Sequence, residues 1–144
     1  MAYVTRAPID PAPLLAEARR DGDGGLTLFV GVVRDNADGR AVTAMEYEAY
    51  EPMAEKEMAR IEADLAVRFP GVRLVMRHRI GRLLVGEVAV VVAAAAPHRE
   101  EAFAACRAGI EEIKARVPVW KREWGPDGSV WVDPCGTGQE HESC

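Results

Sequence analysis

The sequence has 144 residues, enough for one domain whose core needs neither disulfides nor metal ions. Its composition, 49% hydrophobic and 28% charged, is that of an ordinary folded protein. A formal net charge of −5 and a pI near 5.3 argue against a general binder of nucleic acids or membrane surfaces, which would carry a basic excess.

The first third of the chain predicts a short helix followed by two strands. Asp10 is a good helix N-cap and Pro11 suits the first helical position, so a helix begins there and ends before the glycine-rich segment 21–25. Residues Leu26–Arg34 are rich in β-branched side chains and predict a strand. After a polar turn, Val42–Tyr50 alternates, which predicts a second, half-buried strand.

The middle of the chain alternates between helix and strand patterns. Met53–Phe69 carries apolar residues at helical spacing, and Pro70 with Gly71 ends this predicted helix. Val72–Ile80 alternates between apolar and basic residues and predicts a strand. The uninterrupted apolar run Val88–Ala95 predicts a strand that is buried on both faces.

The last part of the chain predicts a helix, a hairpin and a loose tail. The helix begins at Pro97, ends before Pro118 and has an apolar stripe at spacings of three and four. This stripe consists of Phe103, Cys106, Ile110 and Ile113. Val119–Trp124 and Val130–Asp133 predict a hairpin around a Gly-Pro-Asp-Gly turn, whereas 134–144 is polar and has no periodicity.

Alternating strands, hairpins and packed helices favour an α+β fold with a mainly antiparallel sheet. Residues 1–133 are predicted to form one domain, with 134–144 as a flexible tail. No apolar stretch approaches the ~20 residues of a membrane-spanning helix, and the N-terminus lacks the pattern of a secretory signal. Three cysteines without a C-x-x-C spacing indicate neither a disulfide framework nor a zinc site. We therefore expect a reduced, cytoplasmic protein without a metal or a cofactor.

Basic residues gather at the predicted ends of helices and strands despite the acidic total. They are Arg34, His98, Arg99, Lys114, Arg116, Lys121 and Arg122. His98 and Arg99 begin a helix, where free backbone N–H groups and the helix dipole favour an anion such as a phosphate or carboxylate. Two solvated residues in a first helical turn explain the same pattern at least as well.

Lys114 continues the apolar stripe of the last predicted helix, because it lies about three turns beyond Phe103 and only ~20° around the axis. Periodicity alone favours a side chain that snorkels to solvent near the negative end of the helix. The alternative is a partly desolvated amine with a lowered pKa, able to act as base, acid or nucleophile.

Lys121 lies on a strand whose two faces differ in chemistry. It shares one face with Val119 and Glu123, whereas Trp120 and Trp124 share the other. An ordinary exposed strand explains Lys121 as well as a site does. The two tryptophans are predicted to be core residues rather than base-stacking platforms, because the chain lacks a basic face to attract a nucleic acid.

Two further polar residues are predicted to be structural. His78 lies on an apolar strand face and is predicted to be a core histidine whose hydrogen bonds are satisfied. Cys106 lies on the helix stripe and is predicted to be an unreactive core thiol. The three histidines, of which His141 lies in the tail, have no metal-ligand spacing. The residues alone therefore support a cytosolic α+β domain with a small anion-binding basic cluster.

Six short segments occur in an order that is more specific than any one of them. They are Phe29–Arg34, Glu48–Ala54, His78–Gly81, Ala96–Arg99, Lys114–Glu123 and Trp131–Val132. H-R-I-G or A-x-H-R is weak alone, but the ordered set ending in K-x-R-x-P-x-W-K-R-E is a strong signal. Together the segments, from about Leu26 to Val132, resemble the large, catalytic subunit of molybdopterin synthase, the MoaE family.

The resemblance implies a reaction and an assembly. In this family a small ubiquitin-like (MoaD-like) sulfur-carrier subunit inserts its C-terminal glycine thiocarboxylate into a pocket on the large subunit. Two carriers deliver two sulfurs to cyclic pyranopterin monophosphate, which opens the cyclic phosphate and forms the dithiolene of molybdopterin. The resemblance thus implies a sulfurtransferase, an α+β fold with a hammerhead-like subdomain, and a heterotetramer built around a homodimer of the large subunit.

The resemblance also implies roles for the basic cluster. Lys114 matches the family's essential lysine, a general acid/base for sulfur addition or a covalent partner of the acyl tail. Lys121 matches a second catalytic lysine, which holds substrate or stabilises developing negative charge. The other matched positions are expected to bind substrate: Val32, Val33, Arg34, His98, Arg99, Arg122 and Glu123.

One segment departs from the family pattern. Relatives often carry a basic residue directly after the Trp-Val of the last strand, where it reaches the site of a neighbouring subunit. This chain has Asp133-Pro134-Cys135 there, so the shared contact either comes from another residue or is absent.

Two other functions stay open. A non-enzymatic adaptor for a ubiquitin-like tail would need a groove for that tail but not both Lys114 and Lys121. A different enzyme on the same scaffold, acting on another phosphorylated pterin or a nucleotide, would be expected to differ at Arg34, His98 or Arg99, and all three match.

Overall fold

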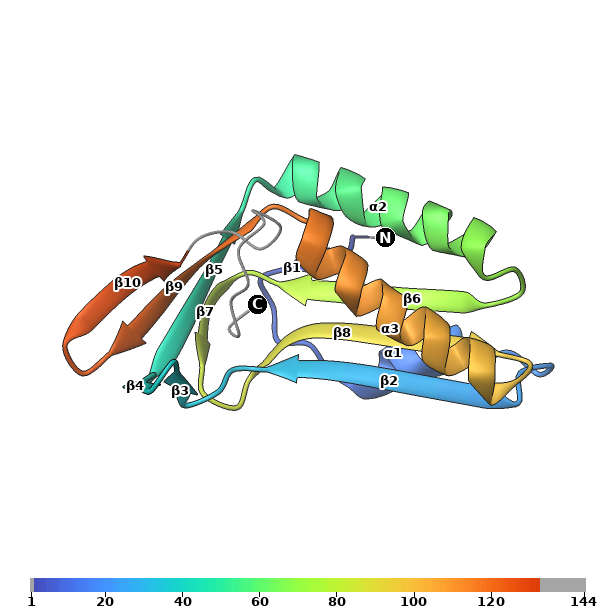
Figure 1. The fold of residues 1–144 in the computed structure, drawn as a ribbon, viewed down its shortest axis with the longest axis horizontal. Helices are drawn as coiled ribbons and strands as arrows, with labels where there is room; N and C mark the ends of the chain where they lie inside the picture. The colour runs from blue at the N-terminus through green and yellow to red at the C-terminus, as the bar shows by residue number, and fades with distance from the viewer. Residues whose placement is uncertain (1, 133–144) are drawn as a thin grey trace.

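A computed structural model describes residues 2–132, and Figure 1 shows it as a ribbon. The predicted tail at 134–144, with Cys135, His141 and Cys144, lies outside the described residues, as does Asp133. Within residues 2–132, no helix is both long and apolar enough to cross a membrane. The predicted α+β class with mainly antiparallel sheets is confirmed, because helices pack around sheets in which β1 and β6 form the one parallel strand pair of this part of the chain.

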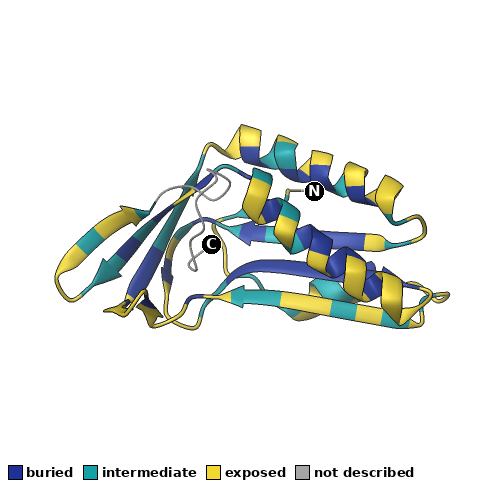
Figure 2. Cartoon of the chain, in the orientation of Figure 1, coloured by how far each residue is buried: buried dark blue, intermediate teal, exposed yellow. Residues whose placement is uncertain are grey.

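The larger sheet has the strand order β1-β6-β8-β2, and its three long strands are antiparallel. Its strands are β1 (Val4–Thr5), β6 (Arg73–Arg79), β8 (Val88–Ala96) and β2 (Gly25–Val32). Strand β8 is buried along nearly its whole length, as its apolar run predicted, and Figure 2 shows this clearly. Strand β2 forms an edge, and its residues are exposed or half-buried.

Helices cover both faces of the larger sheet. Helix α1 (Pro11–Ala18) packs on one face, while α2 (Glu51–Arg68) and α3 (Arg99–Arg116) lie on the other (Figure 1). Alternate residues of β8 therefore belong to two hydrophobic clusters. Val90, Val92 and Ala94 face α2 and α3, and Ala93 and Ala95 face α1.

Helix α3 lies close to the sheet because small residues make up most of its buried face. These are Ala102, Ala105, Cys106, Ala108 and Gly109. A Cβ atom at Gly109 would lie 2.9 Å from Cγ1 of Val92, so the close approach requires glycine. The prediction that Phe103 is buried is wrong: it is 63% exposed, because small residues rather than large ones face the sheet. Cys106 is buried as predicted, and its thiol donates a hydrogen bond to the Val92 carbonyl.

The smaller sheet has the order β10-β9-β5-β7 and stands beside one end of the larger sheet (Figure 1). Its strands, all antiparallel, are β5 (Ala44–Ala49), β7 (Gly81–Leu84), β9 (Val119–Gly125) and β10 (Gly128–Val132). The predicted hairpin at the end of the chain is confirmed as β9 and β10. The hammerhead-like subdomain that the resemblance implied stays a prediction.

The shortest strands are absent from the prediction. Besides β1 and β7, these are β3 (Asn36–Ala37) and β4 (Arg40–Ala41), which form a small hairpin in the predicted polar turn. Asp38 and Gly39 between them have positive φ angles, as a two-residue type I′ turn requires.

The predicted burial of the two strand tryptophans is wrong. Trp120 is 41% exposed, and Trp124 is half-buried on the same outer face of β9. Instead of entering a core, the Trp124 ring stacks against guanidinium groups, with Arg82 at 4.8 Å and Arg122 at 4.6 Å from its centre.

Candidate active site

A cavity of about 60 Å³ lies where the C-terminal part of α3 meets the smaller sheet. Four elements supply its polar lining: Tyr47 from β5, His78 from β6, Lys114 from α3 and Lys121 from β9. The rest of the lining is mainly aliphatic and includes Ile113, Val117 and Val119. Two lysines from different elements therefore share one largely apolar cavity.

Lys121 is buried in this cavity. Strand β9 alternates so that Val119, Lys121 and Glu123 form its buried face. Lys121 is only 3% exposed, and its Nζ has no hydrogen-bond partner among the described residues. Burial and the nearby charges of Lys114 and Arg34 lower the pKa of Lys121 to about 8, against the opposing effect of Glu123.

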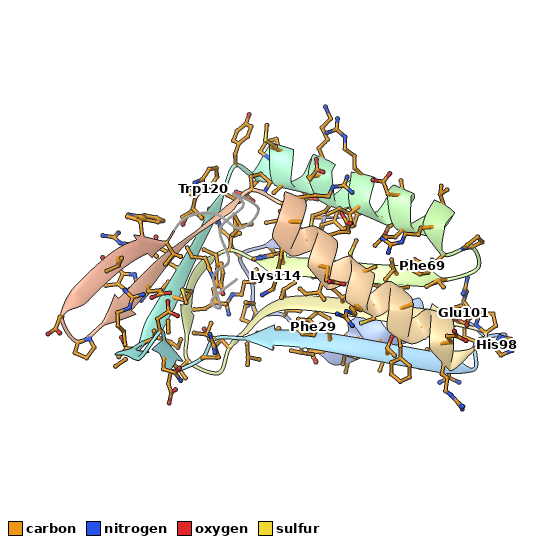
Figure 3. All side chains as sticks on the ribbon, viewed as in Figure 1. Phe29, Phe69, His98, Glu101, Lys114 and Trp120 are labelled. Atoms are coloured by element: carbon orange, nitrogen blue, oxygen red, sulfur yellow. The ribbon has the colours of Figure 1, made fainter. Side chains whose placement is uncertain are left out.

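Lys114 lies at the rim of the cavity, in the last turn of α3 (Figure 3). Its side chain is exposed in part, yet the partial burial of its amine, followed by repulsion from Arg34, lowers the pKa of Lys114. The two alternatives that periodicity left open are therefore combined, because the side chain reaches solvent and its amine is partly desolvated.

A second hollow of about 40 Å³ shares Tyr47 with the cavity. The end of β2 and the residues after it line this hollow with Val32, Val33 and Arg34. Arg34 is exposed, and its charge acts on both lysines. The site thus has three cationic groups from β9, α3 and the segment after β2.

Glu123 is the acidic group beside this cluster. Its Oε2 accepts a hydrogen bond from Arg40 of β4 at 2.9 Å, whereas its Oε1 is buried without a hydrogen-bond partner among residues 2–132. The ion pair therefore ties the β3–β4 hairpin to β9. Burial, together with the Glu123 charge, raises the pKa of Tyr47 to about 12, so the Tyr47 phenol stays protonated at neutral pH.

His78, like Tyr47, is a residue of this site that the sequence did not indicate. It is buried, and its Nδ1 lies 2.9 Å from the carbonyl oxygen of Arg79, so the prediction of a satisfied core histidine is confirmed. It also lines the cavity, and burial with the nearby charges of Lys114 and Lys121 lowers the pKa of His78 to about 4, although the Arg79 contact opposes this. Alternation on β6 indicates the face on which His78 lies, but no sequence signal indicates that a cavity opens there.

A larger hollow lies elsewhere. It measures about 490 Å³ and is lined by residues of α1, α2 and β6, including Glu17, Arg20 and Arg77. Its charged groups pair with one another or with neighbours: Arg77 with Glu17 at 3.4 Å, and Arg20 with Asp23 at 2.9 Å. The smaller lysine cavity is the better candidate for chemistry, because its residues have shifted pKa values and the Lys121 ammonium has no hydrogen-bond partner in the described part of the chain.

The arrangement around Lys114 and Lys121 suits an anionic substrate that needs proton transfer. Clustered cations attract a phosphate or carboxylate, and an apolar wall strengthens that attraction. An amine whose pKa lies near 8 exists in both protonation states near neutral pH, so it can act as acid and as base.

Comparison with known proteins decides the family. Residues 4–116 match the family model described as MoaE protein. The chain belongs to the MoaE family. Relatives named molybdopterin synthase catalytic subunit include those of Nostoc sp., 43% identical over 98% of this chain and 87% of that protein, and of Bacillus subtilis, 40% identical over 90% and 82%.

Solved MoaE structures share the fold. A molybdopterin synthase structure from Staphylococcus aureus matches with a TM-score of 0.88 at 36% identity, and the match covers 92% of this chain and 96% of that one. A chain from a complex of subunits 1 and 2 of molybdopterin-converting factor from Helicobacter pylori has a TM-score of 0.75 at 21% identity, with 96% and 91% covered. The second likeness shows the fold alone.

The structure brings together most of the residues that the MoaE resemblance indicated, but not Arg122. The segment 32–34, Lys114, Lys121 and Glu123 all lie at or beside the cavity. Arg122 points to the opposite face of β9, where its guanidinium stacks on Trp124 and Trp131 and its Nε donates to Ser129 Oγ at 2.8 Å. Strand alternation explains the difference, because neighbouring residues of β9 face opposite sides. A substrate contact from Arg122 is therefore not supported within one chain.

His98 and Arg99 also lie apart from the MoaE lysines. They stand at the beginning of α3, whereas Lys114 stands at its end, about 24 Å away at 1.5 Å per residue (Figure 3). Within one copy of the chain, these two residues and the lysine cavity cannot contact the same small substrate.

Proposed function

We propose that this chain is the large subunit of molybdopterin synthase and transfers sulfur to cyclic pyranopterin monophosphate. The sulfur comes from the C-terminal thiocarboxylate of a small ubiquitin-like carrier, and two transfers form the dithiolene of molybdopterin. Relatives named molybdopterin synthase catalytic subunit support the proposed enzymatic activity. The two-subunit complex of molybdopterin-converting factor from Helicobacter pylori supports the proposal that a small subunit binds this chain.

One observation carries the proposal: Lys114 and Lys121 share a cavity in which both have lowered pKa values. A surface that only bound a peptide tail would not need a buried ammonium that lacks a hydrogen-bond partner within residues 2–132, because such burial costs folding free energy. Such costs are typical of active sites, where binding or chemistry makes use of the uncompensated group.

Lys114 is the group that the carrier's tail meets first, because it lies at the rim of the cavity. Its lowered pKa increases the neutral fraction of the amine, which can take up a proton or accept the acyl group released when sulfur leaves the thiocarboxylate. Lys121 lies deeper, where its ammonium holds the substrate and stabilises negative charge that develops on it.

Substrate anions are held by the outer part of the same cluster. Arg34, beside Val32 and Val33, offers a planar guanidinium suited to a phosphate or a terminal carboxylate. Glu123 orients this cluster through its ion pair with Arg40 and its proximity to Lys121.

A homodimer brings His98 and Arg99 to the site of a second copy. Strand β2 is an edge of the larger sheet as far as residues 2–132 are concerned, and Leu26, Leu28 and Phe29 along it are 41%, 40% and 37% exposed. Arg34 follows the end of β2, whereas Arg99 adjoins its start, since a Cβ at Gly25 would lie 3.0 Å from the Arg99 Cα. Two antiparallel β2 strands related by a twofold axis would therefore place Arg99 of one copy beside Arg34 of the other.

The reconstituted reaction tests the proposed function. The chain is mixed with a thiocarboxylated small subunit and cyclic pyranopterin monophosphate, and molybdopterin is measured by mass spectrometry and by its fluorescent oxidation product. Product that depends on both added components supports the synthase. A stable complex with the small subunit and no product would instead indicate an adaptor, and the sulfur transfer proposed here would be wrong.

A further inference from the structure

His78 lines the cavity, and one of its two ring nitrogens is bound to the backbone. Its Nδ1 lies 2.9 Å from the carbonyl oxygen of Arg79, and a carbonyl oxygen only accepts hydrogen bonds. Nδ1 must therefore carry the ring proton in the neutral imidazole. Nε2, on the opposite side of the ring, then has a free lone pair and can only accept.

The surroundings of the ring keep it neutral and fixed. His78 is 8% exposed, and the Tyr47 ring packs edge-on against it, with 5.5 Å between ring centres. The charged groups that act on the imidazole are Lys114 from α3 and Lys121 from β9, and both oppose its protonation. His78 is therefore a hydrogen-bond acceptor in a cavity whose other polar groups include two amines.

The Lys121 ammonium needs such an acceptor. Its Nζ is buried and has no hydrogen-bond partner among the described residues, although it lines the same cavity as His78. No hydrogen bond joins Lys121 Nζ directly to the His78 ring. The cavity of about 60 Å³ exceeds the roughly 10–15 Å³ that one water molecule needs. A water there would donate to Nε2 and accept from Nζ, and so satisfy both groups.

We propose that His78 is a positioning residue that holds the Lys121 ammonium in place through one bridging water. The imidazole keeps the amine oriented until the substrate anion arrives and replaces the water as its acceptor. The effect on catalysis rests on the proposed function, whereas the effect on Lys121 itself does not.

The sequence makes the central measurement simple, because Lys56, Lys114 and Lys121 are its only lysines. With ¹³C-labelled lysine side chains, each amine is titrated by NMR, and Lys121→Arg assigns the signal of Lys121. Lys56 on the exposed side of α2 serves as an internal reference. Besides Lys114, the groups whose charges act on Lys121 are Glu123 and Arg34, and all variants keep them.

Three variants separate an acceptor from a packing effect. His78→Leu removes the acceptor and should lower the pKa of Lys121 by about one unit, the scale of one hydrogen bond to a charged group. His78→Gln places an amide oxygen near the position of Nε2 and should recover at least half of that shift. Met76→Leu, a buried change two residues earlier on the same face of β6, should leave the pKa of Lys121 unchanged.

Two results would overturn the proposal in a folded protein. One is an unchanged Lys121 pKa in His78→Leu, or equal shifts in the leucine and glutamine variants. The other is a long-range ¹H–¹⁵N spectrum that shows the His78 proton on Nε2, or on both nitrogens, at pH 7.

Given sulfur transfer by the wild type, His78→Leu should also lower kcat about ten-fold at little-changed KM, with recovery in His78→Gln. Absence of sulfur transfer by the wild type would refute the proposed function and leave the Lys121 titration to decide the role of His78.

Discussion

Burial of Lys121 opposes folding, because an ammonium in an apolar cavity loses hydration that Glu123 only partly replaces. The pKa falls from 10.5 in a free lysine to about 8, which corresponds to a cost on the order of 3 kcal/mol in the protonated state. A residue that is retained at such a cost fits a site where the charge is used, and stability is commonly sacrificed for activity at such sites.

Lys121→Met should therefore stabilise the protein while sulfur transfer is lost. Below pH 8 the wild-type ammonium is protonated in both states, so the methionine should raise the free energy of unfolding by about 2–3 kcal/mol at pH 7. Between pH 8 and 10.5 the unfolded lysine binds a proton that the folded one does not, so wild-type stability rises and the advantage of methionine shrinks. Urea unfolding followed by tryptophan fluorescence at pH 7 and pH 10 measures both.

Lys56→Met is the matched control for this substitution, because Lys56 is exposed on α2. It should change the free energy of unfolding by less than about 0.5 kcal/mol at either pH. A Lys121→Met variant that is less stable than the wild type at pH 7, or whose advantage does not depend on pH, contradicts the desolvated ammonium.

Sequence patterns were informative to different degrees for Lys121 and Lys114. Alternation on β9 correctly placed Lys121 with Val119 and Glu123, but which face is buried depends on α3 and the larger sheet, which local periodicity does not report. The prediction for Lys114 came from the apolar stripe of the helix. That stripe wrongly included Phe103 as a buried residue, because small residues form the buried face of α3. Strand alternation places Arg122 and Lys121 on opposite faces of β9, so their separation could be predicted from the sequence. The cavity beside His78 could not be predicted from it.

Helix α3 positions Lys114 through its close packing on β8. The approach depends on Gly109, five residues before Lys114, where an added Cβ would meet the stiff side chain of Val92 at 2.9 Å. The long helices and strands were predictable because their periodic patterns extend over many residues. Strands β1, β3 and β4 have two residues each, too few for any periodicity, and only tertiary pairing defines them.

Gly109→Val should lower the free energy of unfolding by about 2 kcal/mol, because overpacking against β8 outweighs the better helix propensity of valine. Chemical denaturation measures the loss. Ala104→Val, on the exposed side of α3, is the control and should stay within about 0.5 kcal/mol of the wild type. A Gly109→Val protein as stable as this control would show that α3 does not need the close approach.

At the scale of the whole molecule, His98 and Lys114 lie about 24 Å apart along α3, so they would act in one site only in a dimer. The exposed apolar edge of β2 is the surface that a second copy would cover. In that arrangement each site combines the lysines of one copy with His98 and Arg99 of the other.

Subunit mixing tests this shared site. Lys114→Ala and Arg99→Ala, each nearly inactive alone, should recover about a quarter of wild-type activity when unfolded and refolded together, because half of the dimers are mixed and each has one intact site. Mixing Lys114→Ala with Lys121→Ala is the control and should recover none, since both changes fall in the cavity of a single chain. Equal recovery in the two mixtures, or none in the first, rules out the proposed dimer site.

A single-turnover assay of two variants decides whether the lysine cavity takes part in sulfur transfer. The wild type, Lys114→Ala and Lys56→Ala are each mixed with thiocarboxylated carrier and cyclic pyranopterin monophosphate, and molybdopterin is measured over time. Lys114→Ala should stay folded and bind the carrier, yet form product at least about 100-fold more slowly, as expected for loss of a group in acid–base catalysis. Lys56→Ala should match the wild type. Near-normal turnover in a folded Lys114→Ala protein would contradict the assignment of this cavity as the active site.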